Sequence, residues 1–245
     1  MAKDSSQSAY SLSVVVMAYN EAESIPHLLA ALTHYLASRE VLADSDRLVR
    51  LTEWEILVVD DGSTDSTAEA VTLAALDNNH IRLVSHPHNM GMGAAIRSGY
   101  NAARMDFVTQ LPADFQVPPE TLDLFIPLAP EHDLILSVYS NRGASPTRRF
   151  LAAGYRLVAR LILGQRADYT GTMLFNRSLL EGIELTTDSF VANLEFPLKA
   201  LRRGASSALV TFVPSPRLAG ESKVANTRRI AFVFAELIRL RQRGL

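Results

Sequence analysis

The chain has 245 residues, a length that fits one large α/β domain or two small ones. Its 24 Lys and Arg residues against 26 Asp and Glu give a formal net charge of -2, which excludes a polycation that binds nucleic acid. Hydrophobic residues make up 48% and charged residues 20%, a balance too apolar for a disordered chain.

The sequence has no cysteine, which excludes disulfides, thiolate metal sites and a cysteine nucleophile and fits a reducing compartment. The N-terminal stretch Met1–Ser8 is polar and lacks the apolar core of a signal peptide. No run reaches the roughly 18–20 apolar residues that cross a bilayer. We therefore expect a soluble or peripheral protein.

The first half of the chain alternates strand and helix patterns, which the apolar periodicity and the capping residues delimit. Strands are expected at residues 12–18, 55–60, 81–85, 107–111 and 134–139. Helices are expected at residues 24–41, 66–76, 91–104, 118–127, 147–163 and from about 227, with a polar loop at 43–53. Ser24 and Ser66 are the expected N-caps, the second within a capping box that ends at Glu69. Such repeated β–α units predict a mostly parallel sheet with helices on both faces.

Polar motifs follow three of these strands, at the point where each strand ends. Tyr19-Asn20-Glu21 follows the first strand, Asp60-Asp61-Gly62 the second and Asp114 the fourth. Ligands of open α/β sheets bind outside the carboxyl ends of the strands. We therefore expect the functional site at this edge.

The stretch EILVVDDGSTDST, residues 55–67, delivers two carboxylates into a turn that is rich in small hydroxyl residues. A carboxylate there can accept hydrogen bonds from a nucleotide's base or ribose. An Asx-turn followed by a helix cap is the structural alternative.

Together with VVVMAYNEAESI, residues 14–25, this stretch resembles the nucleotide-binding half of family-2 glycosyltransferases with the GT-A fold. The resemblance implies an α/β, GT-A (Rossmann-like) domain with C-terminal amphipathic helices. It also implies a set of nucleotide-binding positions: Ala18, Tyr19, Glu21, Asp60, Asp61, Gly91, Ala113 and Asp114.

Residues 88–95, HNMGMGAA, resemble the family's N-x-G-x-G-x-A helix start. The same glycines also suggest a dinucleotide fingerprint, but Ile96 stands where its third glycine would be, and a long loop separates the motif from the preceding strand. Close packing of the helix on the sheet is a structural reason for these glycines.

Residues 113–120, ADFQVPPE, resemble the D-A-D-x-Q-x-P-P-E segment of dolichyl-phosphate mannose synthases and bacterial polyprenyl-phosphate sugar transferases. The resemblance implies that Asp114 and Gln116 hold Mg²⁺ or Mn²⁺ together with the diphosphate. Pro112 occupies the position of the first aspartate. The cation is then held more weakly, or arginines share its role, or activity is lost.

Later segments resemble the family in the same order. These are the basic segment at 139–149, residues 168–175, the helix around Asn193–Phe196 and the R-x-x-G-x-S-K loop at 217–223. By resemblance, catalytic roles go to Asp114, Arg142, Arg217 and Lys223, and binding of the acceptor phosphate goes to Arg142 and Arg149.

The resemblance implies an inverting transfer of a sugar from a GDP- or UDP-sugar. A polyprenyl or dolichyl phosphate acceptor is already an anion and needs no general base. A soluble or saccharide hydroxyl acceptor needs one, for which Glu195 or Asp168 is a candidate. A non-catalytic nucleotide-binding protein is the third hypothesis.

Residues 147–163 and the C-terminal stretch from 227 combine arginines with apolar residues, as helices at an anionic membrane surface do. Packing into the core or into a homodimer is the alternative. We expect a flexible N-terminus at 1–10, a GT-A domain at 11–225 and a basic amphipathic helix at 226–245. The expected location is the cytoplasmic face of the membrane, with peripheral attachment.

Overall fold

The computed structural model describes residues 8–38, 42–44, 47–140, 169–215 and 227–243. Its strands are β1 Ser8–Ala18, β2 Leu42–Asp44, β3 Arg47–Asp60, β4 Ile81–Ser85, β5 Phe107–Pro112, β6 Leu134–Tyr139, β7 Thr170–Asn176 and β8 Ser207–Phe212. They form one sheet in the order β2-β3-β1-β5-β7-β6-β8, and β4 pairs with the carboxyl half of β3. The pairs β1–β3, β1–β5, β3–β4 and β6–β8 are parallel.

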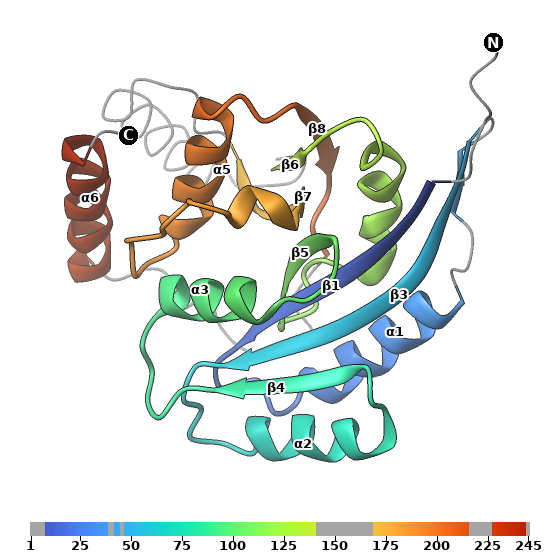
Figure 1. Ribbon diagram of the computed structural model, residues 1–245. Coiled ribbons are helices and arrows are strands. Elements are labelled where there is room, and N and C mark those ends of the chain that lie inside the picture. The colour runs from blue at the N-terminus through green and yellow to red at the C-terminus, as the bar shows by residue number, and fades with distance from the viewer. Residues whose placement is uncertain (1–7, 39–41, 45–46, 141–168, 216–226, 244–245) are drawn as a thin grey trace, which may run out of the picture.

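Helices cover both faces of this sheet, as the sequence predicts (Figure 1). The α-helices are α1 Ile25–Ala37, α2 Thr67–Asp77, α3 Met92–Ala102, α5 Ala192–Arg202 and α6 Thr227–Gln242, and the 3-10 helices are η1 Pro119–Leu124, η2 Ile126–Leu128 and η3 Arg177–Leu180. Side chains of β1 alternate between the two cores: Val14 and Val16 pack with α1, whereas Val15 packs with α3.

The register of the three central strands decides where the site lies. Ala18 at the end of β1 pairs with Asp60 at the end of β3, and Met17 pairs with Pro112 at the end of β5. The loops that follow these strands therefore leave the sheet side by side, at the edge that the sequence predicts.

Inside β3, opposite Ser13 of β1, lies a buried carboxylate, Glu55, which is 3% exposed. It accepts hydrogen bonds from the hydroxyl of Ser13 at 2.7 Å and from the backbone N–H of Arg104 at 2.8 Å. The guanidinium of Arg82 pairs with its other oxygen at 2.5 Å. This network fixes the end of α3 against β1 and β3.

The prediction of a polar loop at residues 43–53 is wrong, because β2 and the first half of β3 occupy these residues. Leu51 pairs with Tyr10, and both side chains are buried, at 6% and 4% exposure. β1 correspondingly begins at Ser8, so residues 8–10 lie in the sheet rather than in a flexible tail. Pairing with a neighbouring strand outweighs the polar composition of this stretch.

The helix expected at 118–127 is replaced by η1 and η2, which are 3-10 helices. Pro119 and Pro127 remove backbone donors at the start of each, and short runs with prolines suit the tighter helix.

The prediction of a capping box at Ser66 is also wrong. The Ser66 side chain makes no cap hydrogen bond, and the carboxylate of Asp65 accepts the backbone N–H of Thr67 instead, at 3.0 Å. The helix expected at 147–163 lies outside the described residues.

Candidate functional site

The turn after β3 is built around the carboxylate of Asp60, which is 3% exposed. Its Oδ1 accepts hydrogen bonds from the backbone N–H of Ser63 at 3.1 Å and from the Ser63 hydroxyl. This is the Asx-turn that the sequence leaves open as an alternative. Within the described part of the chain, both hydrogen bonds of this carboxylate go to Oδ1, so the turn engages only one of the two oxygens.

The loop after β1 is tied to the turn after β3 by side-chain hydrogen bonds. Asn20, with a left-handed φ of 54°, accepts the backbone N–H of Thr64 at 2.8 Å. The backbone N–H of Glu21 donates to the Thr67 hydroxyl at 2.9 Å, and the Glu21 carboxylate accepts the Ser24 hydroxyl at 2.7 Å. The two loops that carry Tyr19, Glu21 and Asp60 are therefore one connected unit.

Asp61, the neighbour of Asp60, has a different set of partners. Its Oδ1 accepts the backbone N–H of Met90 at 2.8 Å and lies 2.7 Å from Nδ1 of His86, while Oδ2 accepts the backbone N–H of Gly91 at 2.9 Å. Nε2 of His86 contacts the Ser98 hydroxyl at 2.9 Å. Asp61 thus anchors the loop before α3 to the end of β3.

His86 is not singled out in the sequence, although a signal for it exists. It follows β4 directly, and a polar residue directly after a strand is the same signal that marks Asp60.

Asp114 lies just beyond β5 and is 7% exposed. Its Oδ1 accepts the backbone N–H of Gln116 at 3.1 Å across Phe115, which has a left-handed φ of 63°. The charge of Asp114 acts on Tyr139, at the end of β6. Burial raises the pKa of Tyr139, and the Asp114 charge raises it further, against a hydrogen bond with Thr172 that lowers it.

A cation at this edge finds few protein ligands. Among the described residues, no group of three or more His, Asp or Glu side chains could hold a metal ion. Asp114 offers one carboxylate, and Pro112 offers no side-chain oxygen. This donor set fits Mg²⁺ or Mn²⁺ only where phosphate oxygens of a bound nucleotide supply most of the coordination.

The two glycines at the start of α3 make room for another backbone rather than for the sheet. A Cβ on Gly91, which has a φ of 92°, would lie 2.7 Å from the carbonyl oxygen of Asp188, and one on Gly93 would lie 2.1 Å from that of Thr187. The expectation of helix–sheet packing is wrong for both. Gly99 has that role, since its Cβ would lie 2.3 Å from a methyl of Val15.

Glu195, the candidate general base for a hydroxyl acceptor, is fully buried in α5. Its two oxygens accept the backbone N–H groups of Thr186 and Thr187 at 2.9–3.0 Å, both threonine hydroxyls, and the ammonium of Lys199 at 2.6 Å. Burial raises the pKa of Glu195, but the hydrogen bonds from Lys199 and the threonines outweigh it and hold that pKa below its usual range. A carboxylate so occupied is a poor proton acceptor.

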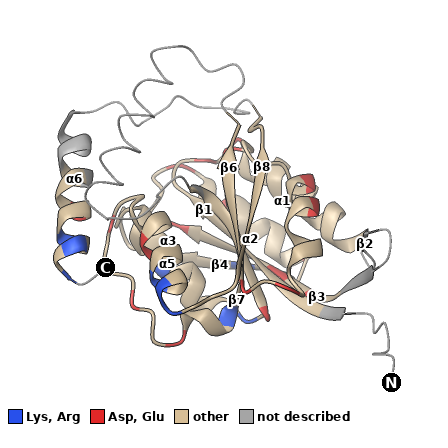
Figure 2. Cartoon of the chain, turned by 90° about the horizontal axis from the view of Figure 1, so that it is seen from above, with Lys and Arg blue, Asp and Glu red and all other residues tan. Residues whose placement is uncertain are grey.

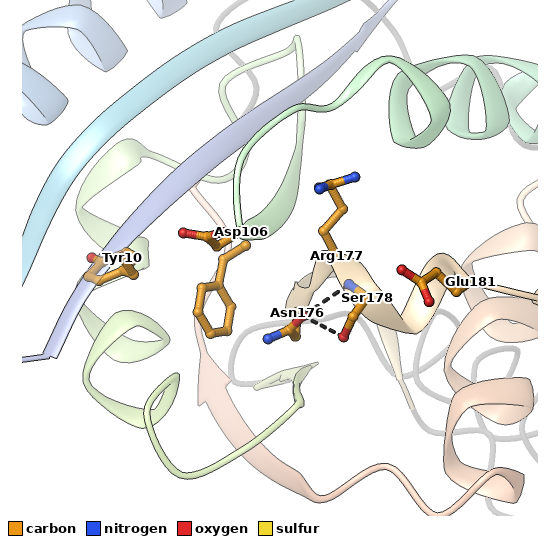
Figure 3. Close-up of a pocket in the computed structure, with 7 residues that line it drawn as sticks. Tyr10, Asp106, Asn176, Arg177, Ser178 and Glu181 are labelled. Atoms are coloured by element: carbon orange, nitrogen blue, oxygen red, sulfur yellow. Dashed lines mark hydrogen bonds between the residues drawn. The ribbon is translucent and has the colours of Figure 1, made fainter.

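A pocket in the structure lies elsewhere, beside the start of β5 and the end of β7 (Figure 3). It is lined by Tyr10, Asp106, Phe107, Asn176, Arg177, Ser178 and Glu181. This is the amino end of β5, opposite to the edge that carries Asp60 and Asp114. The remaining site predictions, Arg142, Arg149, Asp168, Arg217 and Lys223, lie outside the described residues.

The family model described as glycosyl transferase family 2 matches residues 13–190, which is more than half of the 245-residue chain. The chain belongs to this family. The family was predicted from the motifs that follow β1, β3 and β5, and that prediction is confirmed.

Two relatives illustrate the likeness. One is the undecaprenyl-phosphate 4-deoxy-4-formamido-L-arabinose transferase of Yersinia pestis, 31% identical over 176 residues, which are 70% of this chain and 50% of the relative. The other is the dolichyl-phosphate beta-glucosyltransferase of Trichomonas vaginalis, 35% identical over 177 residues, 68% of this chain and 53% of the relative. The chain spans about half the length of the curated relatives it matches.

Solved structures confirm the GT-A-like α/β fold. Glucosyl-3-phosphoglycerate synthase from Mycobacterium tuberculosis, in complex with Mn²⁺, UDP-glucose and phosphoglyceric acid, aligns with a TM-score of 0.64 at 21% identity. The alignment covers 93% of this chain and 80% of the other. The same synthase is also known with Mg²⁺ and UDP, at a TM-score of 0.61 and 21% identity over 93% of this chain and 79% of the other.

Replacing Glu195 distinguishes a structural role from a catalytic one. Glu195→Gln should lower the free energy of unfolding by about 2–4 kcal/mol, because the Lys199 ammonium and several donors lose a charged partner. The loss should be largest at neutral pH and shrink in acid, since a lowered pKa stabilises the fold only while the carboxylate is ionised. Denaturant unfolding between pH 3 and pH 7 (roughly the carboxylate range) measures both effects. A variant of unchanged stability would contradict this role; the exposed Glu184→Gln is the matched control.

Proposed function

We propose that this protein transfers a sugar, with inversion, from a GDP- or UDP-sugar to a polyprenyl or dolichyl phosphate. The observation that carries the proposal is the placement of Asp60 and Asp114 at the carboxyl ends of β3 and β5, on either side of β1. The names of the relatives, an undecaprenyl-phosphate sugar transferase and a dolichyl-phosphate glucosyltransferase, support the acceptor class.

The donor's nucleoside belongs at the unit formed by the loops after β1 and β3. Asp60 offers Oδ2 as an acceptor for a base or ribose donor, at a position that its own Oδ1–Ser63 turn fixes. Tyr19, Glu21 and the backbone at Ala18 border the same turn, and Asp61 and Gly91 shape its far side. Ala113 and Asp114 then lie toward the diphosphate.

Mg²⁺ or Mn²⁺ is the proposed cofactor, held by Asp114 and Gln116 together with phosphate oxygens. When bound, the ion neutralises the charge that develops on the leaving nucleoside diphosphate. Arg217 and Lys223 are the predicted cationic partners of the leaving diphosphate. Arg142 and Arg149 are the predicted partners of the acceptor phosphate.

The acceptor chemistry follows from which bases the site offers. A phosphate oxygen is already an anion at neutral pH and attacks without a base, whereas a hydroxyl must lose a proton. The Glu195 carboxylate accepts hydrogen bonds from five donor groups and is unsuited to take that proton. Asp168, the other candidate base, lies outside the described residues, so the engaged Glu195 counts against one of the two bases that a hydroxyl acceptor could use.

Helix α6 supports attachment to an anionic membrane. Leu237 and Leu240 are buried against α5, while Phe232 and Ile238 are 45% and 48% exposed. Its last turn carries the exposed Arg239 and Arg241, at the blue end of the helix in Figure 2, and the exposed Arg243 follows directly. We place the protein at the cytoplasmic face of the membrane, and a homodimer across the exposed side of α6 is the competing arrangement. In the described residues, no helix is long and apolar enough to span a bilayer.

The proposed reaction is tested by incubating the protein with labelled GDP- and UDP-sugars and Mn²⁺, in parallel with undecaprenyl phosphate and with a water-soluble saccharide as acceptor. Label should enter the organic phase. In a binding measurement, Asp60→Asn should weaken the affinity for the nucleotide by about tenfold to a hundredfold, which corresponds to the loss of one hydrogen bond to a charged group. The exposed Asp77→Asn is the control. Transfer to a water-soluble acceptor only would favour the hydroxyl hypothesis, and nucleotide binding without turnover would favour a non-catalytic protein.

Asp114 should carry the metal dependence of nucleotide binding. Asp114→Ala should abolish the gain in nucleoside diphosphate affinity that Mn²⁺ gives and leave affinity in a chelator nearly unchanged, because it removes the one anionic ligand of this segment. Pro112→Asp should increase the gain. Calorimetric titrations with Mn²⁺ and with chelator measure this, with Asp77→Ala as control. Full Mn²⁺ enhancement in Asp114→Ala would show that the carboxylate only shapes the turn.

Membrane attachment through α6 should depend on lipid charge and salt. The protein should sediment with anionic vesicles at low salt and detach at high salt. Replacing Arg239, Arg241 and Arg243 by Gln should weaken the partition by about a hundredfold, at about 1 kcal/mol for each arginine near the surface. Equal recovery on neutral and anionic vesicles at every salt concentration would contradict an electrostatic attachment.

A further inference from the structure

Residues 186–189, the segment between η3 and α5, are held from three helices at once. From α5, the buried Glu195 holds the backbone and hydroxyls of Thr186 and Thr187. From α3, the guanidinium of Arg97 donates to the Thr187 carbonyl at 2.6 Å and to the Asp188 carboxylate at 2.7 Å. The third contact comes from α6, far along the chain.

That third contact is the carboxylate of Glu236. It is 4% exposed and accepts the backbone N–H groups of Asp188 at 2.7 Å and of Ser189 at 3.2 Å. Glu236 is the one acid of a C-terminal stretch, residues 227–245, that holds five arginines. The Glu236 carboxylate binds backbone groups of the domain rather than the guanidinium of Arg239, one helical turn further along. Leu237 and Leu240 seat the same face of α6 on α5.

The 186–189 segment touches the start of α3 on its other side. The backbone N–H of Gly93 donates to the Asp188 carbonyl at 2.9 Å. Neither Gly91 nor Gly93 has room for a Cβ beside residues 187 and 188, so the two backbones are in direct contact. A shift of the segment therefore moves the first turn of α3.

The first turn of α3 is bound in turn to the proposed donor site. The N–H groups of Met90 and Gly91 donate to the Asp61 carboxylate, and Asp61 follows Asp60 directly. A continuous chain of contacts thus runs from Glu236 on α6, through the 186–189 segment and Gly91–Gly93, to the turn that presents Asp60.

We propose that Glu236 is a positioning residue for the donor site, and that nucleotide binds tightly only while α6 is seated on the domain. The expected effect on nucleotide affinity rests on the proposed function. The structural link from Glu236 to the loop before α3 does not. Such a link gives α6, the helix that we place at the membrane, a direct influence on the affinity for the donor.

The test compares Glu236→Ala and Glu236→Gln with the exposed Glu184→Gln in the full chain. Hydrogen–deuterium exchange, resolved to single amides, is followed at Asp188 and Ser189 and at Met90, Gly91 and Gly93. Affinities for UDP and GDP are measured by calorimetry with Mn²⁺ present. Glu236→Ala should speed exchange in both groups of amides and weaken the bound nucleotide by about three- to thirtyfold, since it acts through an intervening segment. Glu236→Gln keeps one acceptor oxygen and should show a smaller effect, and Glu184→Gln should show none.

A purely structural Glu236 would give a different pattern. Faster exchange confined to Asp188 and Ser189, with unchanged nucleotide affinity, would overturn the proposal, as would a uniform rise in exchange over the whole chain. If Glu236→Ala does not fold, Glu236→Gln carries the same comparison. If the wild-type chain binds neither nucleotide, the proposed function fails, and the exchange pattern at Met90–Gly93 still decides whether the link exists.

Discussion

Ala18 pairs with Asp60 and Met17 pairs with Pro112, and the rest of the site depends on this register of β1 with its two parallel neighbours. Each strand is buried on both faces by the alternation of apolar side chains, so a slip by one residue would exchange the two cores. The same pairing that the cores enforce therefore also fixes which loops meet. The polar residues have only to follow their strands to be brought together.

The buried acids of this domain divide into two kinds. Glu55, Asp61, Glu195 and Glu236 have both carboxylate oxygens engaged by backbone N–H groups, side-chain donors or a cation. Glu55, Asp61 and Glu236 thereby join segments that are distant in the sequence, whereas Glu195 holds residues 186–187 just before its own helix. Asp60 has one oxygen engaged by its own turn. Because an ionised carboxylate is costly to bury without partners, the fully engaged acids are assigned a structural role, and Asp60 is the one for which we propose ligand binding.

Much of the carboxyl edge could be predicted from the sequence, because it depends on local patterns: apolar strands that end in Asn, Asp and Gly. β4 and β6 have the bounds that their apolar runs predict, and the family follows from the motifs. The partners of Asp61 could not be predicted in this way. Asp60 and Asp61 are identical in type and adjacent, and what distinguishes Asp61 is the approach of His86, Met90 and Gly91 in the fold.

The same limit applies to β8 and the first half of β3, which form through pairing with strands distant in the sequence rather than through strong local patterns. It applies also to Gly93, whose neighbour in space is Thr187. At that position any larger residue would have to displace a main chain that three helices hold. Gly93 can therefore serve as a sequence marker: where another member of this family has a bulkier residue at the equivalent place, the two backbones must run further apart, and its C-terminal helix would lack this route to the donor loop.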